Sequence, residues 1–401
     1  MSREWRLGMK IGIITFHFAY NCGAVLQCVA LCDKLEQMGH EVCVINYQPW
    51  YHKNRYTPLK NPFYNAAKRA ARRENDSFVK QILRAGKGFL ATVYSWRHYP
   101  KLKKVDRYFN SFIKNNLNET SVYRTYEQLV KNPPKCDIYI SGSDQLWNAK
   151  LTEGKIDMAY LLEFGSKDIR KITYAMGVSL GNDKEKEAVD VVKDSIAKLN
   201  AISLREEECY EYINQLGDNK VPMHIDVDPT FLLKKEDYDK YICEEKLCDE
   251  PFIFTYTMMD KSREEVYKAA TQMGKLHGIK VIDASANPKN PSKLIEEHRV
   301  CGPAQFLWYI KNAEYIVTNS FHGTAFSVNM EKNFVTIPHS QTGYRVTEIL
   351  DKIGLSDRYA DNASDGLKCL ETKADYDKSR EKLDELRGKS VNYLDSQVNI
   401  L

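Results

Sequence analysis

The chain has 401 residues, of which 43% are hydrophobic and 28% charged, a composition typical of a soluble globular protein long enough for two domains. No apolar run approaches the roughly 20 residues needed to cross a bilayer, and the polar residues 1–8 predict the absence of a signal peptide. The ten cysteines form no C-x-x-C pair, which argues for reduced thiols in a cytoplasmic protein and against a disulfide framework or a zinc site.

The formal net charge of +4 is unevenly distributed along the chain. From Tyr51 to Arg107 there are fifteen Lys or Arg and three acidic residues (Glu74, Asp76 and Asp106), a local balance of +12, so the remainder of the chain carries −8. A basic segment inside an otherwise acidic protein predicts a specific anionic surface as its partner.

The chain begins with a predicted β-α-β unit. A buried strand at 10–15, a helix at 24–38 and a second strand at 42–45 follow one another, which predicts a parallel sheet with helices on its faces. In such sheets the loops at the carboxyl ends of the strands form the ligand crevice. Asn21 and Gly23 are therefore candidate ligand contacts, although Asn21 could equally cap the helix.

The basic segment then interrupts the alternation of strands and helices. Apolar residues recur at helical spacing from 78 to 94, and Lys80, Arg84 and Lys87 flank them. A cationic amphipathic helix of this kind can lie on an anionic membrane surface. A helix whose apolar stripe packs on its own domain has the same pattern, so both interpretations stay open. Nucleic acid is disfavoured as a partner, because the chain contains no known binding module.

The alternation resumes with a strand at 137–140, followed by a polar run from Ser141 to Asn148. Small residues directly after a strand let the backbone approach a ligand, and Asp144, Gln145 and Asn148 offer hydrogen-bonding groups.

Arg205 lies between a short strand and the start of a helix. An arginine in this position is suited to bidentate binding of a phosphate or carboxylate, although it could instead pair with the glutamates that follow it. Residues 226–230 predict the exit from the first domain, and further α/β units follow from 252 onward. The charged end of the chain, 376–401, predicts a helix that could reach back to the first domain.

His322 lies in the run from Thr318 to Ala325, between a short buried strand and a helix. Ser320 is a suitable N-cap, and the backbone N–H groups of a helix start favour an anion. A histidine here could contact a phosphate and also transfer protons, since its ordinary pKa is about 6.5. The alternative is that His322 only caps or packs.

Six short motifs occur in order along the chain: Asn21-x-Gly23-Ala24-Val25-Leu26-Gln27, Ser141-Gly142-Ser143-Asp144-Gln145-x-Trp147-Asn148, Tyr174-Ala175, Ser203-x-Arg205-Glu206, Asp226-x-Asp228-Pro229-Thr230 and Ser320-Phe321-His322-Gly323-Thr324. Together they resemble the polysaccharide pyruvyl transferase family, from Lys10 to about Leu355. Each motif is weak alone, but the ordered set is fairly specific.

The resemblance implies an α/β fold class, with two Rossmann-like domains facing a cleft as in GT-B glycosyltransferases. We expect domains at 1–228, with a basic helical insertion at about 51–107, and at 229–375, followed by the helix of 376–401. It also implies phosphoenolpyruvate as the donor and a pair of sugar hydroxyls as the acceptor, giving a cyclic pyruvate ketal in bacterial capsular or exopolysaccharide biosynthesis. Neither a metal nor a cofactor is implied beyond this co-substrate.

The resemblance also implies roles for single residues. His322 would handle protons and Arg205 would contact the donor. Many members have Arg-Leu-His where this chain has Ser320-Phe321-His322. The family arginine is therefore missing here, and another residue must supply part of the binding of the donor. A later basic residue is also expected on the donor, and Arg345 fits by spacing. The full predicted site has His322 and Asp144 as catalytic residues, Arg205, Arg345, Ser320, Gly323 and Thr324 on the donor, and Asn21, Gly23, Ser143, Gln145 and Asn148 on the acceptor.

Several alternatives remain at this point. Asp144 or Asp226 could deprotonate the sugar hydroxyl, and either could equally be structural. The chain could be a GT-B glycosyltransferase that uses a nucleotide sugar, or a non-enzymatic domain that docks on a membrane. If the acceptor is a lipid-linked saccharide, the basic segment would bring the cleft to the inner face of the cell membrane. The protein would then be cytoplasmic and peripherally bound to that membrane.

Overall fold

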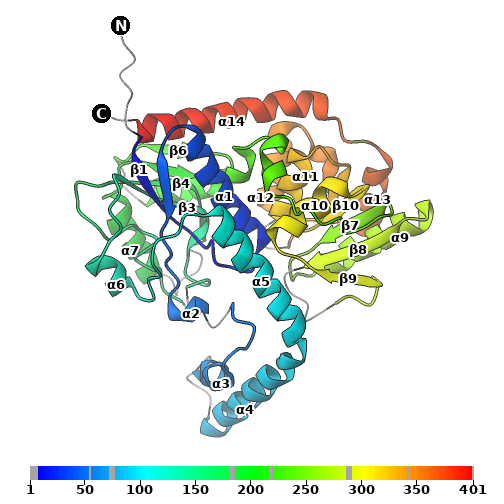
Figure 1. Cartoon of the computed structure of the whole chain (residues 1–401), viewed down its shortest axis with the longest axis horizontal. Helices are drawn as coiled ribbons and strands as arrows, with labels where there is room; N and C mark the ends of the chain where they lie inside the picture. Colours follow the sequence, from blue (N-terminus) through cyan, green and yellow to red (C-terminus); the bar gives the residue numbers. More distant parts are fainter. Residues whose placement is uncertain are drawn as a thin grey trace.

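The computed structural model describes residues 8–53, 56–71, 77–152, 154–179, 186–216, 220–285, 291–340 and 343–399. The first residues of the chain, 1–7, and two parts of the basic segment, 54–55 and 72–76, lie outside this description. Two parallel β-sheets covered by helices make up the body of the molecule, and the long helix α14 (Tyr376–Val398) runs along both (Figure 1).

The first sheet has six strands in the order β2-β1-β3-β4-β5-β6. Strands β1 and β3 pair in parallel with Ile11 opposite Ile138, and their apolar residues are buried. This burial is typical of a parallel sheet with helices on both faces. The strands are β1 (Lys10–Ile14), β2 (Glu41–Val44), β3 (Ile138–Asn148), β4 (Arg170–Ser179), β5 (Ile202–Leu204) and β6 (Met223–Ile225).

Strand β3 is longer than the sequence pattern predicts. The strand was expected to end at Ile140, but it continues through the polar run and pairs with β4 as far as Asn148 opposite Ser179. The pairing is irregular between Asp144 and Trp147, next to the positive φ angles of Gly142 (126°) and Asp144 (88°). Such a local irregularity re-aims side chains without ending the strand.

The second sheet has five strands in the order β11-β10-β7-β8-β9, and all of its ladders are parallel. The two sheets therefore confirm the predicted α/β fold class with two Rossmann-like domains. The strands are β7 (Phe252–Tyr256), β8 (Lys280–Ser285), β9 (Glu297–Val300), β10 (Tyr315–Thr318) and β11 (Phe334–Thr336).

Helix α1 (Cys22–Gln37) lies between the two domains and is buried over most of its length. One continuous apolar cluster joins Leu26 and Val29 of α1 to Phe306 and Phe326 of the second domain. The other helices of the first domain are α6 (Tyr126–Lys131), α7 (Lys186–Ile196) and α8 (Glu207–Gln215). Those of the second are α9 (Arg263–His277), α10 (Pro303–Asn312), α11 (Phe321–Asn329), α12 (Tyr344–Ile353) and α13 (Ala363–Glu371). The described residues also form the short 3-10 helices η3 (Pro229–Phe231), η4 (Lys235–Tyr241) and η5 (Ser356–Arg358).

The basic insertion is helical. Its helices are α2 (Trp50–Lys53), α3 (Pro62–Ala71), α4 (Phe78–Ser95) and α5 (Tyr99–Asn116), with the turn η1 (Trp96–His98) between the last two. Helix α5 packs on the body through buried side chains such as Val105 and Phe109. Helices α3 and α4 project away from the body (Figure 1). The apolar stripe of α4 is exposed, so it does not pack on the protein's own domains.

Helix α14 connects the two halves of the molecule. Near its start, the Tyr376 hydroxyl donates to the Lys332 carbonyl of the second domain at 2.7 Å. Near its end, the Tyr393 hydroxyl donates to the Thr173 carbonyl of the first domain at 3.2 Å. Within the described ranges, no helix combines the length and apolarity needed to cross a membrane.

Candidate active site

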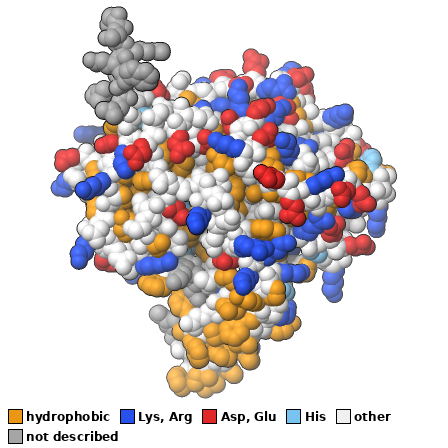
Figure 2. Space-filling model, in the orientation of Figure 1, with side chains coloured by type: hydrophobic (Ala, Val, Ile, Leu, Met, Phe, Trp, Pro, Cys, Tyr) orange, Lys and Arg blue, Asp and Glu red, His pale blue; other side chains and the backbone are white. Residues whose placement is uncertain are grey.

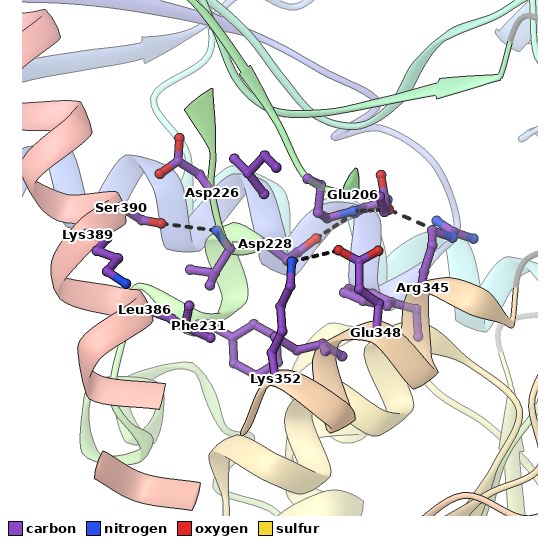
Figure 3. Close-up of a pocket in the computed structure, with 15 residues that line it drawn as sticks. Glu206, Asp226, Asp228, Phe231, Arg345, Glu348, Lys352, Leu386, Lys389 and Ser390 are labelled. Carbon is purple, nitrogen blue, oxygen red and sulfur yellow. Dashed lines mark hydrogen bonds and ion pairs between the residues drawn. The ribbon is translucent and has the colours of Figure 1, made fainter. Parts of the chain in front are cut away.

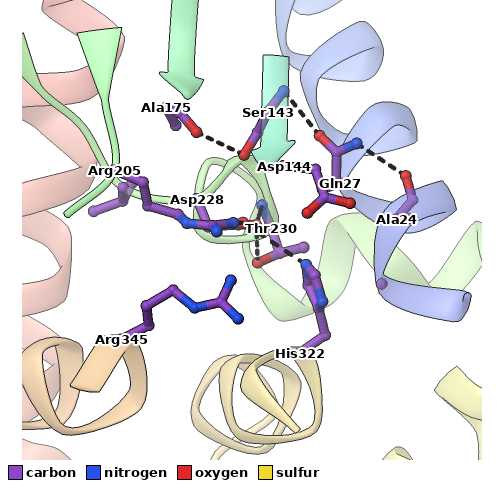
Figure 4. A network of polar contacts seen from close by, with 12 residues as sticks. Ala24, Gln27, Ser143, Asp144, Ala175, Arg205, Asp228, Thr230, His322 and Arg345 are labelled. Carbon is purple, nitrogen blue, oxygen red and sulfur yellow. Dashed lines mark hydrogen bonds and ion pairs between the residues drawn. The ribbon is translucent and has the colours of Figure 1, made fainter. Parts of the chain in front are cut away.

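The predicted site residues meet where the two domains face each other. The carboxyl ends of β3, β5 and β6 approach it from the first domain, and the N-termini of α11 and α12 approach it from the second. Figure 4 shows Arg205, Asp228, Arg345 and His322 pointing toward one another from these elements.

His322 is the second residue of α11. Strand β10 ends at Thr318, and Ser320 caps the helix because its hydroxyl accepts the Gly323 N–H at 3.3 Å. His322 is 9% exposed, and its Nε2 is buried without a hydrogen-bond partner in the described part of the chain. That nitrogen lies 3.7 Å from Asp228 Oδ2, too far for a hydrogen bond but close enough for charge interaction.

Helix α1 reaches His322 through Gly23. A Cβ atom on Gly23 would lie 2.1 Å from the imidazole Cγ and Nδ1, so no residue with a side chain fits there without moving the ring. Asn21 caps α1, with its Oδ1 accepting the Gly23 N–H at 3.0 Å. The capping alternative for Asn21 is therefore present in the structure.

Arg205 is buried among carboxylates. Its Nε donates to Glu206 Oε1 and its Nη1 to Asp228 Oδ2, both at 2.7 Å. Burial opposes the charge on Arg205, but these two carboxylates outweigh it and raise the pKa of the guanidinium above its ordinary value. The remaining Nη2 is buried and has no hydrogen-bond partner among the described residues. Arg205 thus pairs with a glutamate and still offers one donor group.

Asp228 connects Arg205 and His322. Its Oδ1 accepts the N–H of Thr230 at 3.0 Å and the hydroxyl of the same residue at 2.8 Å, and its Oδ2 faces Arg205 and His322. Burial alone would raise the pKa of Asp228, but His322 and Arg205 hold the pKa of this carboxyl well below its usual range. Asp228 belongs to the motif Asp226-x-Asp228-Pro229-Thr230, but no role was predicted for it from the sequence.

Arg345, the second residue of α12, brings a second guanidinium to the site from the other domain. Its Cζ lies 5.9 Å from the centre of the Phe321 ring, and that of Arg205 lies 4.9 Å from the same ring. Burial, and then the charge of Arg205, lower the pKa of Arg345. Two guanidiniums held together in a mostly buried site repel each other, so an anion placed between them would be stabilised.

The polar residues of β3 border this group. Asp144 contributes to the charge environment of both arginines, and its Oδ1 accepts the N–H of Gln145 at 2.8 Å. A Cβ on Gly177 of β4 would lie 3.3 Å from Arg205 Nη2 and 3.0 Å from Gln145 Cγ, so Gly177 leaves room for both side chains. The Nδ2 of Asn148 donates to Gln145 Oε1 at 3.3 Å.

Other predicted residues lie inside the fold. Ser143 is fully buried, with its hydroxyl donating to the Ala175 carbonyl at 2.9 Å and its N–H donating to Gln27 Oε1 at 3.2 Å (Figure 4). Thr324 is also fully buried, and its hydroxyl shares a hydrogen bond with that of Thr336 at 2.7 Å.

Two further residues are constrained by their neighbours. A Cβ on Gly323 would lie 2.3 Å from Thr318 Oγ1, so this position needs glycine for close packing. Asp226 Oδ2 accepts the Ser203 hydroxyl at 2.6 Å inside the first domain.

A pocket extends from the two arginines toward α14 (Figure 3). Its apolar walls include Val227, Phe231 and Leu386, and Glu348 and Lys352 of α12 form an ion pair of 2.7 Å at its side. The pocket therefore has a charged end at Arg205 and Arg345 and an apolar interior.

No group of three His, Cys, Asp or Glu in the described ranges is arranged to hold a metal ion. All ten cysteines are free thiols, outside any disulfide bond.

The protein is an α/β protein of two Rossmann-like domains, with a site of opposed charges between them. The family model described as "Polysaccharide pyruvyl transferase" matches residues 21–341, most of the chain, and the chain belongs to this family. A comparison with curated proteins gave no match.

Among solved structures, the chain is similar to a putative UDP-N-acetylglucosamine 2-epimerase from Listeria monocytogenes, at 9% identity and a TM-score of 0.49, covering 96% of this chain and 94% of that one. It is also similar to Arabidopsis thaliana UGT89C1 complexed with UDP-L-rhamnose, at 11% identity and a TM-score of 0.45, covering 98% and 99%. Similarity at this level does not bear on the activity of this chain.

Proposed function

We propose that this protein transfers the pyruvyl group of phosphoenolpyruvate to two hydroxyls of a sugar and forms a cyclic pyruvate ketal. The observation that carries the proposal is the meeting of Arg205 and Arg345, from different domains, beside His322. Phosphoenolpyruvate is small and has two anionic groups, a carboxylate and a phosphate, which suit two guanidiniums. Arg345 would thereby supply the donor contact that Ser320, in place of the family arginine, lacks.

The reaction requires a group that can donate a proton next to the bound phosphoenolpyruvate. A proton added to the methylene carbon turns it into a methyl group and makes the neighbouring carbon electrophilic. One sugar hydroxyl attacks that carbon, and the second hydroxyl then displaces phosphate and closes the ring. Of the two hydroxyl protons released, one balances the proton gained by carbon and the other leaves with phosphate. His322 is suited to these transfers, since an imidazole can both donate and accept a proton near neutral pH.

The two carboxylates of the site have different roles in this proposal: Asp228 positions its neighbours, and Asp144 acts as a base. Asp228 holds Arg205 at 2.7 Å and faces His322, so it fixes both groups without touching substrate. Asp144 lies on the first-domain side, where Asn21, Gln145 and Asn148 would face the acceptor, and it is the candidate base for the sugar hydroxyl. The reaction needs no cofactor or metal beyond phosphoenolpyruvate.

We place the reaction in the biosynthesis of bacterial surface polysaccharides, with a saccharide on a lipid carrier as acceptor. The exposed basic insertion supports this choice, because a polyprenyl diphosphate carrier is anionic and lies in a membrane.

The test is incubation of the protein with phosphoenolpyruvate and a panel of lipid-linked and water-soluble saccharides. We expect phosphate release that depends on acceptor, together with a product that has gained one pyruvyl ketal by mass spectrometry. Heat-denatured protein serves as the inactive control. Consumption of a nucleotide sugar with release of a nucleoside diphosphate, and none of phosphoenolpyruvate, would reject the proposal.

A further inference from the structure

Helices α3 and α4 form a hairpin that stands out from the two domains, named here the basic hairpin (residues 62–71 and 78–95). Figure 1 shows it below the body, and Figure 2 shows hydrophobic side chains gathered over the same projection. The two helices contact each other through the rings of Phe63 and Phe89, 5.3 Å apart, and through a hydrogen bond of 3.2 Å from Asn65 Nδ2 to Thr92 Oγ1.

Apart from the contact between the Phe63 and Phe89 rings, helix α4 buries small residues and exposes most of its large apolar ones. In α4 only Gly88 and Thr92 are buried. A water-facing hairpin normally has the opposite arrangement, because burying large apolar side chains stabilises it. Small residues at the helix contact and large apolar residues outside are typical of helices surrounded by lipid. The exposed apolar side chains are Phe63 (73%), Phe78 (76%), Val79 (65%), Ile82 (55%), Leu83 (59%), Leu90 (68%), Val93 (37%) and Tyr94 (67%).

The flanks of the exposed stripe are basic. Lys80 and Lys87 are exposed, Arg84 is half-buried, and the Arg97 guanidinium lies 3.5 Å from the centre of the Tyr94 ring. The sequence from Ser77 to Val105 contains no acidic residue. Basic side chains beside an apolar face match the anionic headgroups and acyl chains of a lipid surface.

The body holds the basic hairpin in a fixed position. Helix α4 continues through η1 into α5, whose Val105 and Phe109 are fully buried. Helix α5 also contacts the second domain, since a Cβ on Gly302 at the start of α10 would lie 2.6 Å from Tyr108 Cβ. A surface that binds the basic hairpin would therefore also fix how the two domains are oriented relative to that surface.

We propose that the basic hairpin inserts its apolar face into the surface of an anionic phospholipid bilayer while its basic side chains contact the headgroups. A second copy of this chain is a poorer partner, because it would bring an equally basic hairpin against the first. The hairpin lies in the membrane surface and does not cross it. Membrane binding is independent of the proposed reaction, and only its use, delivery of the site to a lipid-linked acceptor, rests on the proposed function.

The experiment measures sedimentation of the full chain with vesicles of phosphatidylcholine alone or mixed with phosphatidylglycerol, at low and high salt. We expect binding to the anionic vesicles that salt weakens but does not abolish, because insertion of the apolar face is not screened. Leu83→Ser with Leu90→Ser should lower affinity by roughly tenfold for each inserted leucine and remove the salt-resistant part. Lys80→Gln with Lys87→Gln should remove mainly the salt-sensitive part.

The matched control is Met259→Ser with Leu276→Ser, since these residues are 58% and 60% exposed but lie on the second domain. This variant should bind vesicles like the wild type. Failure of the wild type to bind anionic vesicles, or equal binding by the leucine variant, would overturn the proposal. A dimer in sedimentation velocity that the leucine variant abolishes, without vesicle binding, would assign the hairpin to a second copy. Vesicle binding without phosphoenolpyruvate turnover would leave the hairpin proposal standing and reject the proposed reaction.

Discussion

The position of His322 is set by two neighbours that the linear sequence keeps far apart. Gly23 on α1 leaves the space that the imidazole ring occupies, and Asp228 after β6 faces its Nε2 at 3.7 Å. A histidine held in this way between two domains can be presented to a ligand in one orientation, which general acid–base catalysis requires.

We expect His322→Ala to lower turnover by roughly 10²-fold or more, because it removes the group that transfers the proton. The measurement is steady-state phosphate release from phosphoenolpyruvate, with circular dichroism to show that the fold is retained. Normal turnover in this variant would make His322 a structural residue and remove the mechanism proposed above.

Gly23→Ala tests the same geometry without changing a chemical group. The new Cβ would meet the imidazole at 2.1 Å, so the ring or the start of α1 must move. Displacement of a catalytic group by about 1 Å can lower the rate by roughly 10²-fold, so we expect a loss in kcat close to that of His322→Ala.

The matched control is Gly388→Ala on α14, where a Cβ meets nothing within 4 Å. That variant should keep full activity and gain a little stability from the better helix propensity of alanine. Unchanged kcat in Gly23→Ala would show that His322 need not occupy its present position.

Sequence reasoning could identify His322 and Arg205 because each stands at the end of a predicted strand and the start of a helix. The role of Asp228 could not be found in this way, since its two partners, Arg205 and His322, come from different parts of the chain and meet it only in the folded protein.

At the scale of elements, periodicity located the strands and helices but not their partners. The polar run of β3 was expected to be a loop, because polar residues and two residues with positive φ are uncommon in a buried strand. Pairing with β4 outweighs this local preference. The apolar stripe of α4 was recognised, but periodicity cannot tell whether a helical face packs on the protein's own domains. The exposure of its side chains shows that it does not.

The edge of the second sheet provides a pH-dependent contact between elements. His298 on β9 lies 3.0 Å from Asp283 Oδ2 on β8 through its Nδ1, and its Nε2 lies 2.8 Å from the Ser292 carbonyl. The hydrogen bond with Asp283 raises the pKa of His298 above its ordinary value, outweighing the opposite effect of burial. The folded state therefore binds the proton more tightly than the unfolded state.

This contact should stabilise the fold fully below the unfolded pKa of about 6.5, and the contribution should be lost as the pH rises through the folded pKa. We expect His298→Gln to lower the free energy of unfolding at about pH 5.5 by at most about 1 kcal/mol, since partial exposure screens the pair. Urea unfolding at several pH values measures this. A difference between wild type and variant that grows toward alkaline pH would contradict the assignment.

For the whole molecule, the two domains are joined by more than a linker. The apolar cluster through α1 continues from one sheet to the other, and α14 contacts both domains at its two ends. A large apolar contact of this kind limits relative domain motion. Such a contact is not readable from sequence, because α1 has apolar residues on most of its surface and the pattern does not say which neighbour covers each face.

The two arginines differ in what they do before any ligand binds. Arg205 neutralises Asp228 and Glu206 inside the fold, so Arg205→Ala should cost about 3–5 kcal/mol of stability by leaving buried carboxylates unpaired. Arg345→Ala should cost less, since burial and the neighbouring Arg205 both disfavour its charge and its ion pair with Glu206 is longer, at 4.0 Å. Thermal unfolding of the two variants without ligand measures this difference, and equal stability would mean that the ion pairs of Arg205 contribute little.

Because Arg205 and Arg345 belong to different domains, an anion bound by both should tie the domains together. Phosphoenolpyruvate at about 100 times its Kd should raise the free energy of unfolding by about 2.7 kcal/mol, seen as a rise in Tm. Arg345→Ala should lower donor affinity by roughly 10–150-fold and remove between about half and about nine-tenths of that rise at the same concentration. Arg345→Lys should restore it only in part, because an ammonium cannot bind a carboxylate or phosphate in bidentate fashion.

Arg380→Ala, which removes an exposed arginine of α14 paired with Glu331, is the matched control and should respond to phosphoenolpyruvate like the wild type. An undiminished rise in Arg345→Ala would mean that the donor is held by the first domain alone, and the bridging role of Arg345 would be rejected.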